Sequence, residues 1–379
     1  MDANRSVDAK RVDGSCRLAR MTTPGQPDLD KLKIYQKTVF GSLAGAMTSA
    51  LICLGDRLGL YKALARIGAA SSVELARETG LHERWLREWL YQQGAAGILD
   101  HVGEGRFALS AEGNAVLADE SHPAYGAGFF VHLPQTMAVV EKLPEAFRSG
   151  VGLPYDAFGP EGAQGIERSF APWFRALLVP FALPKLPGVV ETLREGGRAA
   201  DVGCGAGVAL LEMAKAFPKA EFHGYEISQH ALARAEQNKS EAGVANAVFH
   251  DARLDGLPED ASLDFITSFD CLHDMSHPQQ VMRAIRRAIR PDGLWLICDI
   301  KARDSYEENV KKNPMASMMY GASVLTCMSS AMSEPHGAGL GTLGFSESVA
   351  RRMCTEAGFT RFEPIDFGHP INAFYVAQP

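Results

Sequence analysis

Three glycines at alternate positions, in the stretch DVGCGAG, have the spacing that most directly suggests chemistry. Gly203, Gly205 and Gly207 follow a strand-like segment and come directly before a helix-like one. Glycines in such a turn let the backbone approach a ligand closely, with the amide groups of the helix facing it. The dinucleotide fingerprint needs a glycine or alanine where this chain has Val208, and no P-loop sequence occurs. The turn therefore predicts a nucleotide-like ligand other than NAD or a nucleoside triphosphate.

Two carboxylates follow the next two strand-like segments. Glu226 ends the second segment, where a carboxylate can accept hydrogen bonds from both hydroxyls of a ribose. Asp251 ends the third segment, where a carboxylate can accept from the amino group of an adenine. A ligand that spans these positions needs a ribose and an adenine but no phosphate.

A histidine follows the fourth strand-like segment, in the stretch SFDCLHDM. His273 is expected on the rim of the sheet, and its ordinary pKa suits a general base that takes a proton from a hydroxyl. The alternative is that His273 and His277 only cap the turn into the helix that begins near Gln279. Asp274 is interpreted as a turn residue.

Strand-like and helix-like segments alternate from Ala199 to the end of the chain. This alternation predicts a mainly parallel, Rossmann-like sheet of seven strands covered by helices on both faces, an α/β fold. Ligands of such sheets bind outside the carboxyl ends of the strands, where the residues above fall. The expected strands are 199–203, 220–227, 247–251, 263–269, 293–300, 361–367 and 372–378, and the expected helices begin near Val208, Ser228 and Gln279, with another over 346–357.

The segment 70–120 predicts a winged helix. A short helix starts at Ser72, the break TGL follows, a second helix covers 82–93, and the strands ILDHV and RFALS form the wing. The segment has four Arg, no Lys and nine Asp or Glu, whereas a helix-turn-helix that grips phosphates usually presents clustered basic residues. We therefore expect a structural or dimerising winged helix, and the charge argues against a nucleic-acid partner.

The expected organisation has four parts: a disordered leader over 1–30, a mainly helical winged-helix and dimerisation domain over 31–120, a helical connector or lid over 121–195, and the α/β domain over 196–379. The stretch 38–55 carries no charge but is rich in small residues, and its GxxxG sequence favours close helix packing. We interpret it as a helix buried in the fold or between the subunits of a homodimer, rather than as a membrane span.

Composition is typical of a cytoplasmic globular protein. A chain of 379 residues suffices for two or three domains, at about 150 residues each. The net charge of −7 gives no general attraction for nucleic acid or an anionic membrane. Seven scattered cysteines without a CxxC pair argue against a disulfide framework or a zinc site and favour a reducing compartment.

The glycine turn, the two acids and the stretch FDCLHDM…AIRPDGLWLICD together resemble the class I S-adenosylmethionine-dependent methyltransferases. With the winged helix before them, nearly the whole chain resembles a mycobacterial group of orphan methyltransferases, similar in layout to dimeric small-molecule O-methyltransferases. The resemblance implies S-adenosylmethionine as the cofactor and S-adenosylhomocysteine as its product. It implies no metal, because the carboxylates and asparagine of the metal-dependent catechol type are missing.

The resemblance also implies roles for individual residues. His273 matches the general base of the O-methyltransferases, although Met275 stands where an aromatic residue is usual, and Asp299 matches an acidic position that orients this base. By the same resemblance, the methionine half of the cofactor lies along Asp201, Gly203, Gly205 and Gly207, with Phe269 and Asp270 at its border. Glu226 holds the ribose. The adenine lies against Ile227, Asp251 and Ala252.

We therefore expect an enzyme that transfers a methyl group from S-adenosylmethionine to an apolar small molecule, most readily by O-methylation with His273 as base. The insertion 301–345 holds five of the thirteen methionines and is interpreted as a wall and lid of the acceptor site, although a helical core stripe fits them nearly as well. Two alternatives remain open. One is a C- or N-methyltransferase that needs no base, and the other is a DNA-binding regulator that senses the cofactor.

Overall fold

The computed structural model describes residues 27–379, and the chain falls into two units, 1–47 and 48–379. The described part of the first unit is the beginning of the long helix α1, Leu29–Arg57. The predicted leader lies almost wholly outside the described residues, but Leu29 and Asp30 belong to this helix.

The expectation that the stretch 38–55 is buried within the fold is wrong for most of its length. Phe40 and Leu43 are exposed, an added Cβ at Gly41 would meet no atom within 4 Å, and burial begins only at Ile52. By length and composition α1 is able to cross a membrane, and a bent helix pair over 155–195 passes the same test when it is counted as one span.

The winged helix predicted from the sequence is present after α1. Ser71 caps the helix that begins at Ser72. The Ser71 hydroxyl accepts from the backbone N–H of Glu74 at 3.3 Å, and the Glu74 carboxylate accepts from the backbone N–H of Ser71 at 2.8 Å. Trp89 and Tyr61 pack edge to face in its core. Its elements are α2 (Leu60–Ile67), α3 (Ser72–Thr79), α4 (Glu83–Ala95), α5 (Ala111–Leu117) and the antiparallel wing of β1 (Asp100–His101) and β2 (Phe107–Ala108).

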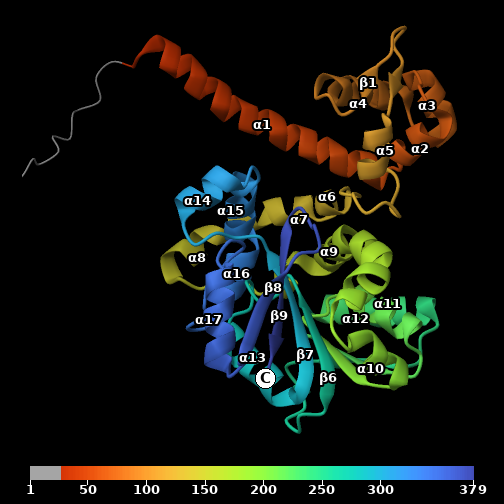
Figure 1. Cartoon of the computed structure of the whole chain (residues 1–379). Helices are drawn as coiled ribbons and strands as arrows, with labels where there is room; N and C mark the ends of the chain where they lie inside the picture. The colour runs from red at the N-terminus through yellow and green to blue at the C-terminus, as the bar shows by residue number, and fades with distance from the viewer. Residues whose placement is uncertain (1–26) are drawn as a thin grey trace, which may run out of the picture. The chain divides into compact units, whose positions relative to one another are not determined.

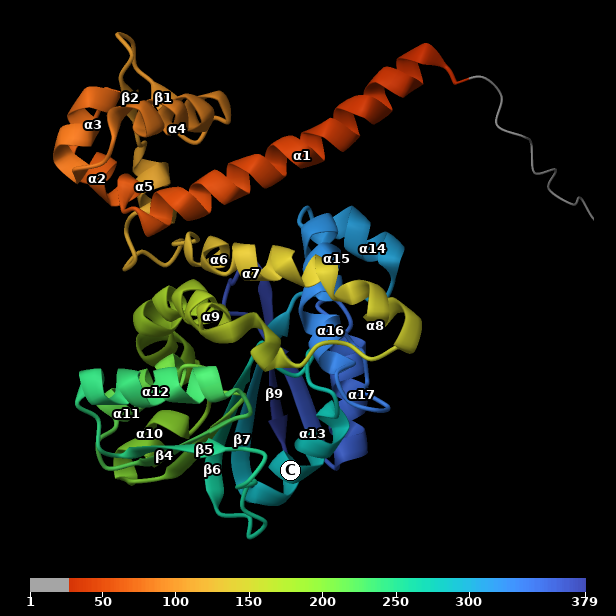
Figure 2. The same ribbon diagram turned by 180° about the vertical axis from the view of Figure 1, so that it is seen from behind.

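The connector forms a run of short helices between the winged helix and the sheet (Figures 1 and 2). Prolines and glycines keep most of its helices short, and η3 is a π-helical segment. The helices are α6 (Gly128–Val131), α7 (Leu133–Ala138), η1 (Val139–Glu141), α8 (Leu143–Ser149), η2 (Tyr155–Phe158), α9 (Gly159–Trp173), η3 (Phe174–Ala182), η4 (Leu183–Lys185) and α10 (Val189–Glu195).

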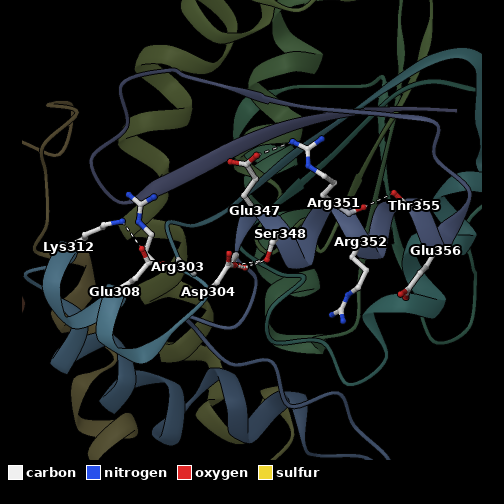
Figure 3. Close-up of a pocket in the computed structure, with 12 residues that line it drawn as sticks. Arg303, Asp304, Glu308, Lys312, Glu347, Ser348, Arg351, Arg352, Thr355 and Glu356 are labelled. Atoms are coloured by element: carbon white, nitrogen blue, oxygen red, sulfur yellow. Dashed lines mark hydrogen bonds and ion pairs between the residues drawn. The ribbon is translucent and has the colours of Figure 1, made fainter.

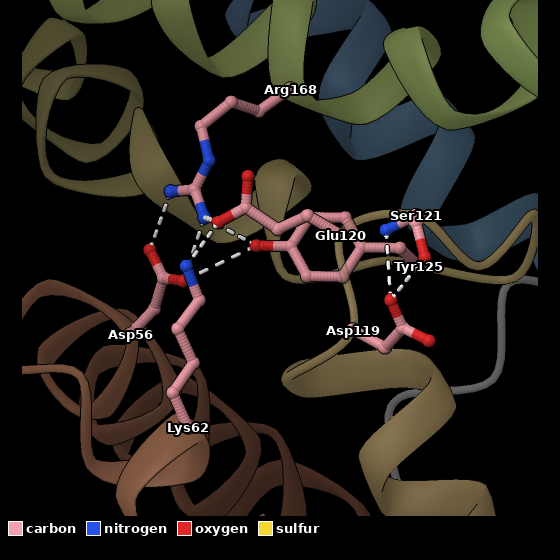
Figure 4. A network of polar contacts seen from close by, with 7 residues as sticks. All are labelled: Asp56, Lys62, Asp119, Glu120, Ser121, Tyr125 and Arg168. Atoms are coloured by element: carbon pink, nitrogen blue, oxygen red, sulfur yellow. Dashed lines mark hydrogen bonds and ion pairs between the residues drawn. The ribbon is translucent and has the colours of Figure 1, made fainter.

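An ion-pair network joins the winged helix to α9 (Figure 4). Arg168 on α9 donates two hydrogen bonds to Asp56 at the end of α1, at 2.7 and 2.9 Å, and a third to Glu120 at 3.1 Å. Lys62 on α2 also donates to Glu120, at 2.6 Å, and the Tyr125 hydroxyl contacts the same guanidinium. The Asp56 side chain is nearly buried, and the Arg168 guanidinium compensates its charge there.

The seven-stranded sheet follows the order β5-β4-β3-β6-β7-β9-β8. The first five strands in this order run parallel, and β9 pairs antiparallel with both β7 and β8. The mainly parallel α/β sheet predicted from the alternating segments is confirmed. Its strands are β3 (Arg198–Val202), β4 (Glu221–Glu226), β5 (Ala247–Asp251), β6 (Leu263–Phe269), β7 (Ile289–Ile300), β8 (Arg361–Ile365) and β9 (Asn372–Gln378).

Helices cover both faces of the sheet because the central strands are apolar on both sides. One core forms between the sheet and η3, α10 and α11 (Val208–Ala216), and the other between the sheet and α13 (Pro278–Ala288) and α17 (Glu347–Ala357). α12 (Gln229–Ala242) lies beside α11 on the first face (Figure 2). The insertion 301–345 contains α14 (Tyr306–Lys312), α15 (Ala316–Leu325) and α16 (Cys327–Ala331).

Candidate active site

The site is assembled at the carboxyl ends of β3, β4, β5, β6 and β7. In the sheet register Glu226 lies opposite Asp251, and Phe269 lies opposite Cys298, the residue before Asp299. The residues predicted from four separate stretches of sequence are therefore brought to one edge of the sheet. Parallel strands dictate this, since their carboxyl ends meet there.

The glycine turn lies between β3 and α11 and adopts positive φ at all three glycines. An added Cβ at Gly203 would meet the side chain of Cys271 at 2.7 Å, and one at Gly207 would meet the Phe249 ring at 2.4 Å. At Gly205 it would meet nothing within 4 Å. Gly203 and Gly207 are thus required by packing, whereas Gly205 leaves open space on the side where a ligand is expected.

Glu226 lies directly beside this turn. One carboxylate oxygen accepts a hydrogen bond from Gly205 N at 2.8 Å, and the other accepts from Ile227 N and Ser228 N at 2.8 and 2.9 Å. Burial raises the pKa of Glu226, and these three N–H groups oppose that rise. The carboxylate is therefore held rigidly at the end of β4, and the oxygen that accepts from Gly205 N has one acceptor site left.

At the end of the site where the adenine is expected, Asp251 forms an ion pair that the sequence did not predict. Both oxygens of Asp251 accept hydrogen bonds from Arg253 at 2.9 Å, and Gln229 donates to one of them at 2.8 Å. These bonds, led by those from Arg253, lower the pKa of Asp251 to about 2. Ile227 is 49% exposed beside it, and Ala252 packs against the core under α13. An adenine amino group would share this carboxylate with Arg253.

Two further predicted carboxyls lie deep at the same edge. Asp201 accepts from the Thr267 hydroxyl at 2.7 Å, and burial together with the Glu226 charge raises its pKa to about 7. Asp270 accepts from the amide of Asn372 at 2.6 Å, and burial together with the Asp299 charge raises its pKa to about 8. Such a concentration of buried acids attracts a cationic group.

Phe269, the other residue predicted beside the methionine half, packs toward the connector. Its ring meets Phe174 of η3 edge to face, with centroids 4.9 Å apart. It therefore belongs to the wall between the sheet and η3.

His273 is hydrogen-bonded to Asp299, which lies too far away in the sequence for spacing alone to predict the contact. Its Nδ1 lies 2.6 Å from Asp299 Oδ1, and both side chains are buried. A carboxylate only accepts, so Nδ1 carries a proton and Nε2 is the nitrogen left to act as a base. Burial alone would lower the pKa of His273, but Asp299 and Cys327 raise it well above the usual value. His277 lies at the start of α13 without capping it and pairs with Glu334 at 3.1 Å.

The connector adds two residues that were not predicted. Asp156 in η2 accepts from the backbone N–H of Gln229 at 3.2 Å and from the Ser228 hydroxyl, so it lies directly beside the Glu226 loop. Burial raises the pKa of Tyr155, with further contributions from Asp274 and Glu226. The sequence offers only an indirect signal for them, since it predicts a helical connector or lid without singling out any of its residues.

The insertion closes the other side of the site. Its backbone donates from Gly341 N to the carbonyl of His273 at 3.0 Å and from Ala338 N to the carbonyl of Ser276 at 2.8 Å. Cys327 at the start of α16 contributes to the raised pKa of His273, and His273 in turn lowers the pKa of Cys327 to about 7. Spacing in the sequence gave no indication of this cysteine.

A separate surface hollow of about 650 Å³ lies between α14 and α17 (Figure 3). None of the predicted site residues lines it. Its charges largely pair with one another, as in Lys312 with Glu308 at 2.8 Å and Arg351 with Glu347 at 3.0 Å. Within residues 27–379 no group of three or more His, Cys, Asp and Glu side chains is arranged to hold a metal ion.

Comparisons with known proteins identify relatives of both parts of the chain. Residues 193–358 match the methyltransferase domain family, and residues 46–119 match the Rv2258c-like winged helix-turn-helix domain. The indolepyruvate C-methyltransferase of Streptomyces griseus is 23% identical over 90% of this chain and 95% of its own length.

Solved structures share the fold over nearly the whole chain. A putative O-methyltransferase from Nostoc punctiforme has a TM-score of 0.69 at 18% identity and covers 94% of this chain and 100% of its own. Human N-acetylserotonin methyltransferase, solved with S-adenosylmethionine, has a TM-score of 0.65 at 16% identity, with coverages of 94% and 99%.

Proposed function

The chain is an S-adenosylmethionine-dependent methyltransferase with an amino-terminal winged helix, and we propose that it methylates a hydroxyl of an apolar small molecule with His273 as the general base. The observation that carries the proposal is the buried hydrogen bond between His273 and Asp299. Methyl transfer to a hydroxyl needs a group that removes its proton, whereas transfer to an amine or an activated carbon does not.

The residues at the strand ends fit the cofactor. When bound, S-adenosylmethionine supplies a methyl group on a cationic sulfur. The open space at Gly205 admits a ligand against the backbone, the Glu226 oxygen beside Gly205 offers an acceptor to a ribose hydroxyl, and the buried acids Asp201 and Asp270 favour a positive charge. The remaining predicted contacts, Ile227, Asp251 and Ala252, line the end where the adenine would lie.

His273 then takes the proton of the acceptor hydroxyl on Nε2. Asp299 holds the ring by Nδ1, fixes the tautomer and stabilises the imidazolium that forms. The high pKa of His273 without cofactor keeps it protonated, and a nearby cationic group lowers that pKa because like charges repel. The base is therefore released when the cofactor is in place.

The acceptor side is proposed to be apolar. Met328 and Met332 of the insertion pack around Gly341 and Gly339, behind the loop that holds His273. Methionine side chains adapt to irregular apolar shapes and suit a wall against a flat or lipid-like acceptor.

We also propose that the protein is a cytoplasmic homodimer formed through α1. Side chains along its first turns, among them Val39, Phe40 and Leu43, are exposed and apolar, and a partner copy would cover them. Sedimentation at micromolar concentration should give twice the chain mass, and Phe40→Glu should shift it to the monomer. A monomeric wild type would refute this part of the proposal.

The cofactor assignment is tested by calorimetric titration with S-adenosylhomocysteine. Glu226→Gln keeps the shape of the side chain but loses its charge, so affinity should fall about tenfold or more, as expected when a charged hydrogen bond is lost. Glu241→Gln, on the exposed end of α12, is the matched control and should bind like the wild type. Absence of binding by the wild type would contradict the proposal.

The choice between O- and C- or N-methylation is tested with acceptors found by screening phenolic and lipid-like compounds. His273→Gln should abolish transfer to a hydroxyl while S-adenosylhomocysteine affinity is kept. Full turnover in this variant would favour the C-methyltransferase alternative, which the similarity to indolepyruvate C-methyltransferase keeps open. Steeply salt-dependent binding to promoter DNA would instead support a regulator.

A further inference from the structure

The carboxylate of Asp270 is held by a residue from outside the parallel strands. Asn372 begins β9, which is separated from β6 by β7, and its side-chain amide reaches across the end of β7 to Asp270. The Asn372 Nδ2 donates to both carboxylate oxygens, at 2.6 Å from Oδ2. Asn372 is 3% exposed, so the contact is shielded from solvent. A strand that carries none of the predicted site residues thus supplies a direct partner of one of them.

The backbone fixes both partners of this contact. Asp270 has a φ of +50°, and its N–H donates to the carbonyl of Cys298 at 2.9 Å. The N–H of Asn372 donates to His369 Nδ1 at 2.8 Å, and Asn372 pairs with Ile300 in the sheet register. The loop after β6 and the start of β9 therefore hold the two side chains against each other.

The contact favours the ionised form of Asp270. An amide N–H only donates, and bonds to both oxygens stabilise a carboxylate more than a carboxylic acid. Burial raises the pKa of Asp270 to about 8, with further contributions from Asp299 and Cys327. His273 and Asn372 oppose that rise. Asn372 carries no charge, so its contribution does not change with pH.

We propose that Asn372 is a positioning residue for the cofactor: it holds Asp270 in the orientation and the charge state that favour S-adenosylmethionine over S-adenosylhomocysteine. The proposal rests on the proposed place of Asp270 beside the methionine half of the cofactor. An ionised carboxylate attracts a sulfonium, whereas the product of methyl transfer has lost that charge and gains less. The contact therefore also favours the replacement of spent product by fresh cofactor.

The test is calorimetric titration of the wild type and Asn372→Leu with both ligands between pH 7 and pH 8.5. Leucine has nearly the shape of asparagine but no donor. At pH 7 the affinity for S-adenosylmethionine should fall about tenfold, as expected when a hydrogen bond to a charged group is lost, and the affinity for S-adenosylhomocysteine about twofold or less. The loss for S-adenosylmethionine should shrink to about threefold at pH 8.5, because Asp270 then ionises more readily without the amide.

The neighbour that anchors Asn372 does not titrate in this range. Burial lowers the pKa of His369 to about 4, with a contribution from Lys301, so its imidazole stays neutral above pH 7. The change of affinity with pH in Asn372→Leu is therefore not caused by His369.

Asn309→Leu is the matched control. Asn309 is 2% exposed, and its amide forms two hydrogen bonds with the backbone of Arg303, at 2.9 and 3.0 Å, beside the separate hollow between α14 and α17. This variant should lose stability but keep the wild-type ratio of the two affinities. If Asn372→Leu does not fold, as judged by thermal melting, Asn372→Ser removes the same amide with a smaller polar side chain and should give the same altered ratio.

Asp270→Asn separates the role of Asn372 from the place of Asp270. In an Asp270→Asn background, Asn372→Leu should change the ratio of the two affinities little further, because it acts through that carboxylate. Equal losses for both ligands, a loss that stays constant with pH, or additive effects of the two substitutions would overturn the positioning role. If Asp270→Asn alone left the affinity for S-adenosylmethionine unchanged, the place assigned to Asp270 would be wrong, and the role of Asn372 with it.

Discussion

Asp299 Oδ1 lies 2.6 Å from His273 Nδ1 and also accepts from the backbone N–H of Ile300 at 2.7 Å. The second bond fixes the carboxylate at the end of β7, so the imidazole is held by a rigid strand rather than by its own loop. The other oxygen of Asp299 is buried with no partner among the described residues. The charge of this group is therefore directed mainly at His273.

Replacing this carboxylate should shift the titration of the base. In Asp299→Asn the negative charge that raises the pKa of His273 is gone, so the pKa should fall, as measured by nitrogen NMR of the ring. Transfer to a hydroxyl acceptor should drop about a hundredfold or more, the usual contribution of an oriented base. A variant with unchanged pKa and turnover would show that Asp299 does not orient His273.

Binding of S-adenosylmethionine should release protons. Asp201 and Asp270 have pKa values raised to about 7 and about 8, so at pH 7 without a nearby cation Asp201 is about half protonated and Asp270 is mostly protonated. A sulfonium favours the ionised forms, and about one proton should leave per molecule bound. Calorimetry in buffers of different ionisation enthalpy measures this number.

S-adenosylhomocysteine is the matched ligand for that experiment, because it lacks the positive charge. S-adenosylhomocysteine should release clearly fewer protons on binding. Asp270→Asn should reduce the number of protons that S-adenosylmethionine releases. Equal proton release by the two ligands would place the sulfonium away from these acids.

The stability of the cofactor-free protein should fall as pH rises through neutrality. Asp201 and Asp270 have folded-state pKa values above those of an unfolded chain, so the folded state binds more protons. The free energy of unfolding then decreases as pH rises from about 4 to about 8. The raised pKa of His273 acts with the same sign. Thermal melting between pH 6 and pH 8.5 tests this, and a rising melting temperature would contradict it.

Alanine substitutions at two glycines of the same turn should affect stability and cofactor binding differently. Gly203→Ala places a Cβ at 2.7 Å from Cys271, at a φ of +75°, and should destabilise the fold by about 1–3 kcal/mol. Gly205→Ala meets no atom, so it should cost only about 1–2 kcal/mol, for its left-handed backbone, and should weaken cofactor binding as well. Melting curves and titration with S-adenosylhomocysteine separate the two effects.

The five parallel strands were predictable because each is a short run with apolar residues that ends at, or one residue from, a glycine or an acid. The strands 247–251, 263–269 and 372–378 lie at their expected bounds. The strand ending in Asp299 begins earlier than predicted, at Ile289, because Ile289 pairs with Leu263 across an irregular register. Propensity alone gives no sign of that pairing.

The parts of the site that come from distant segments were not predictable. Asp156 reaches the Glu226 loop from the connector, and Gly341 reaches the carbonyl of His273 from the insertion. Neither segment has a regular pattern. The occupation of Asp251 by Arg253 also depends on a local ion pair that periodicity does not encode. Similarly, an uncharged helix can be buried within the fold or against a partner chain. The exposure of Phe40 shows that the described residues of its own unit do not bury it.

The Arg168 network should couple the winged helix to the rest of the second unit. Arg168→Ala leaves the carboxylate of Asp56, whose side chain is 7% exposed, without its bidentate partner. Because Arg168 itself is partly exposed, the loss should be about 1–3 kcal/mol, less than for a fully buried pair. Arg84→Ala is the matched control, since the Arg84–Glu88 pair is more than half exposed and should contribute about 0.5 kcal/mol or less. The midpoint of urea unfolding should therefore fall clearly for Arg168→Ala and hardly for Arg84→Ala. Equal shifts would show that the network stabilises the fold no more than an exposed ion pair does.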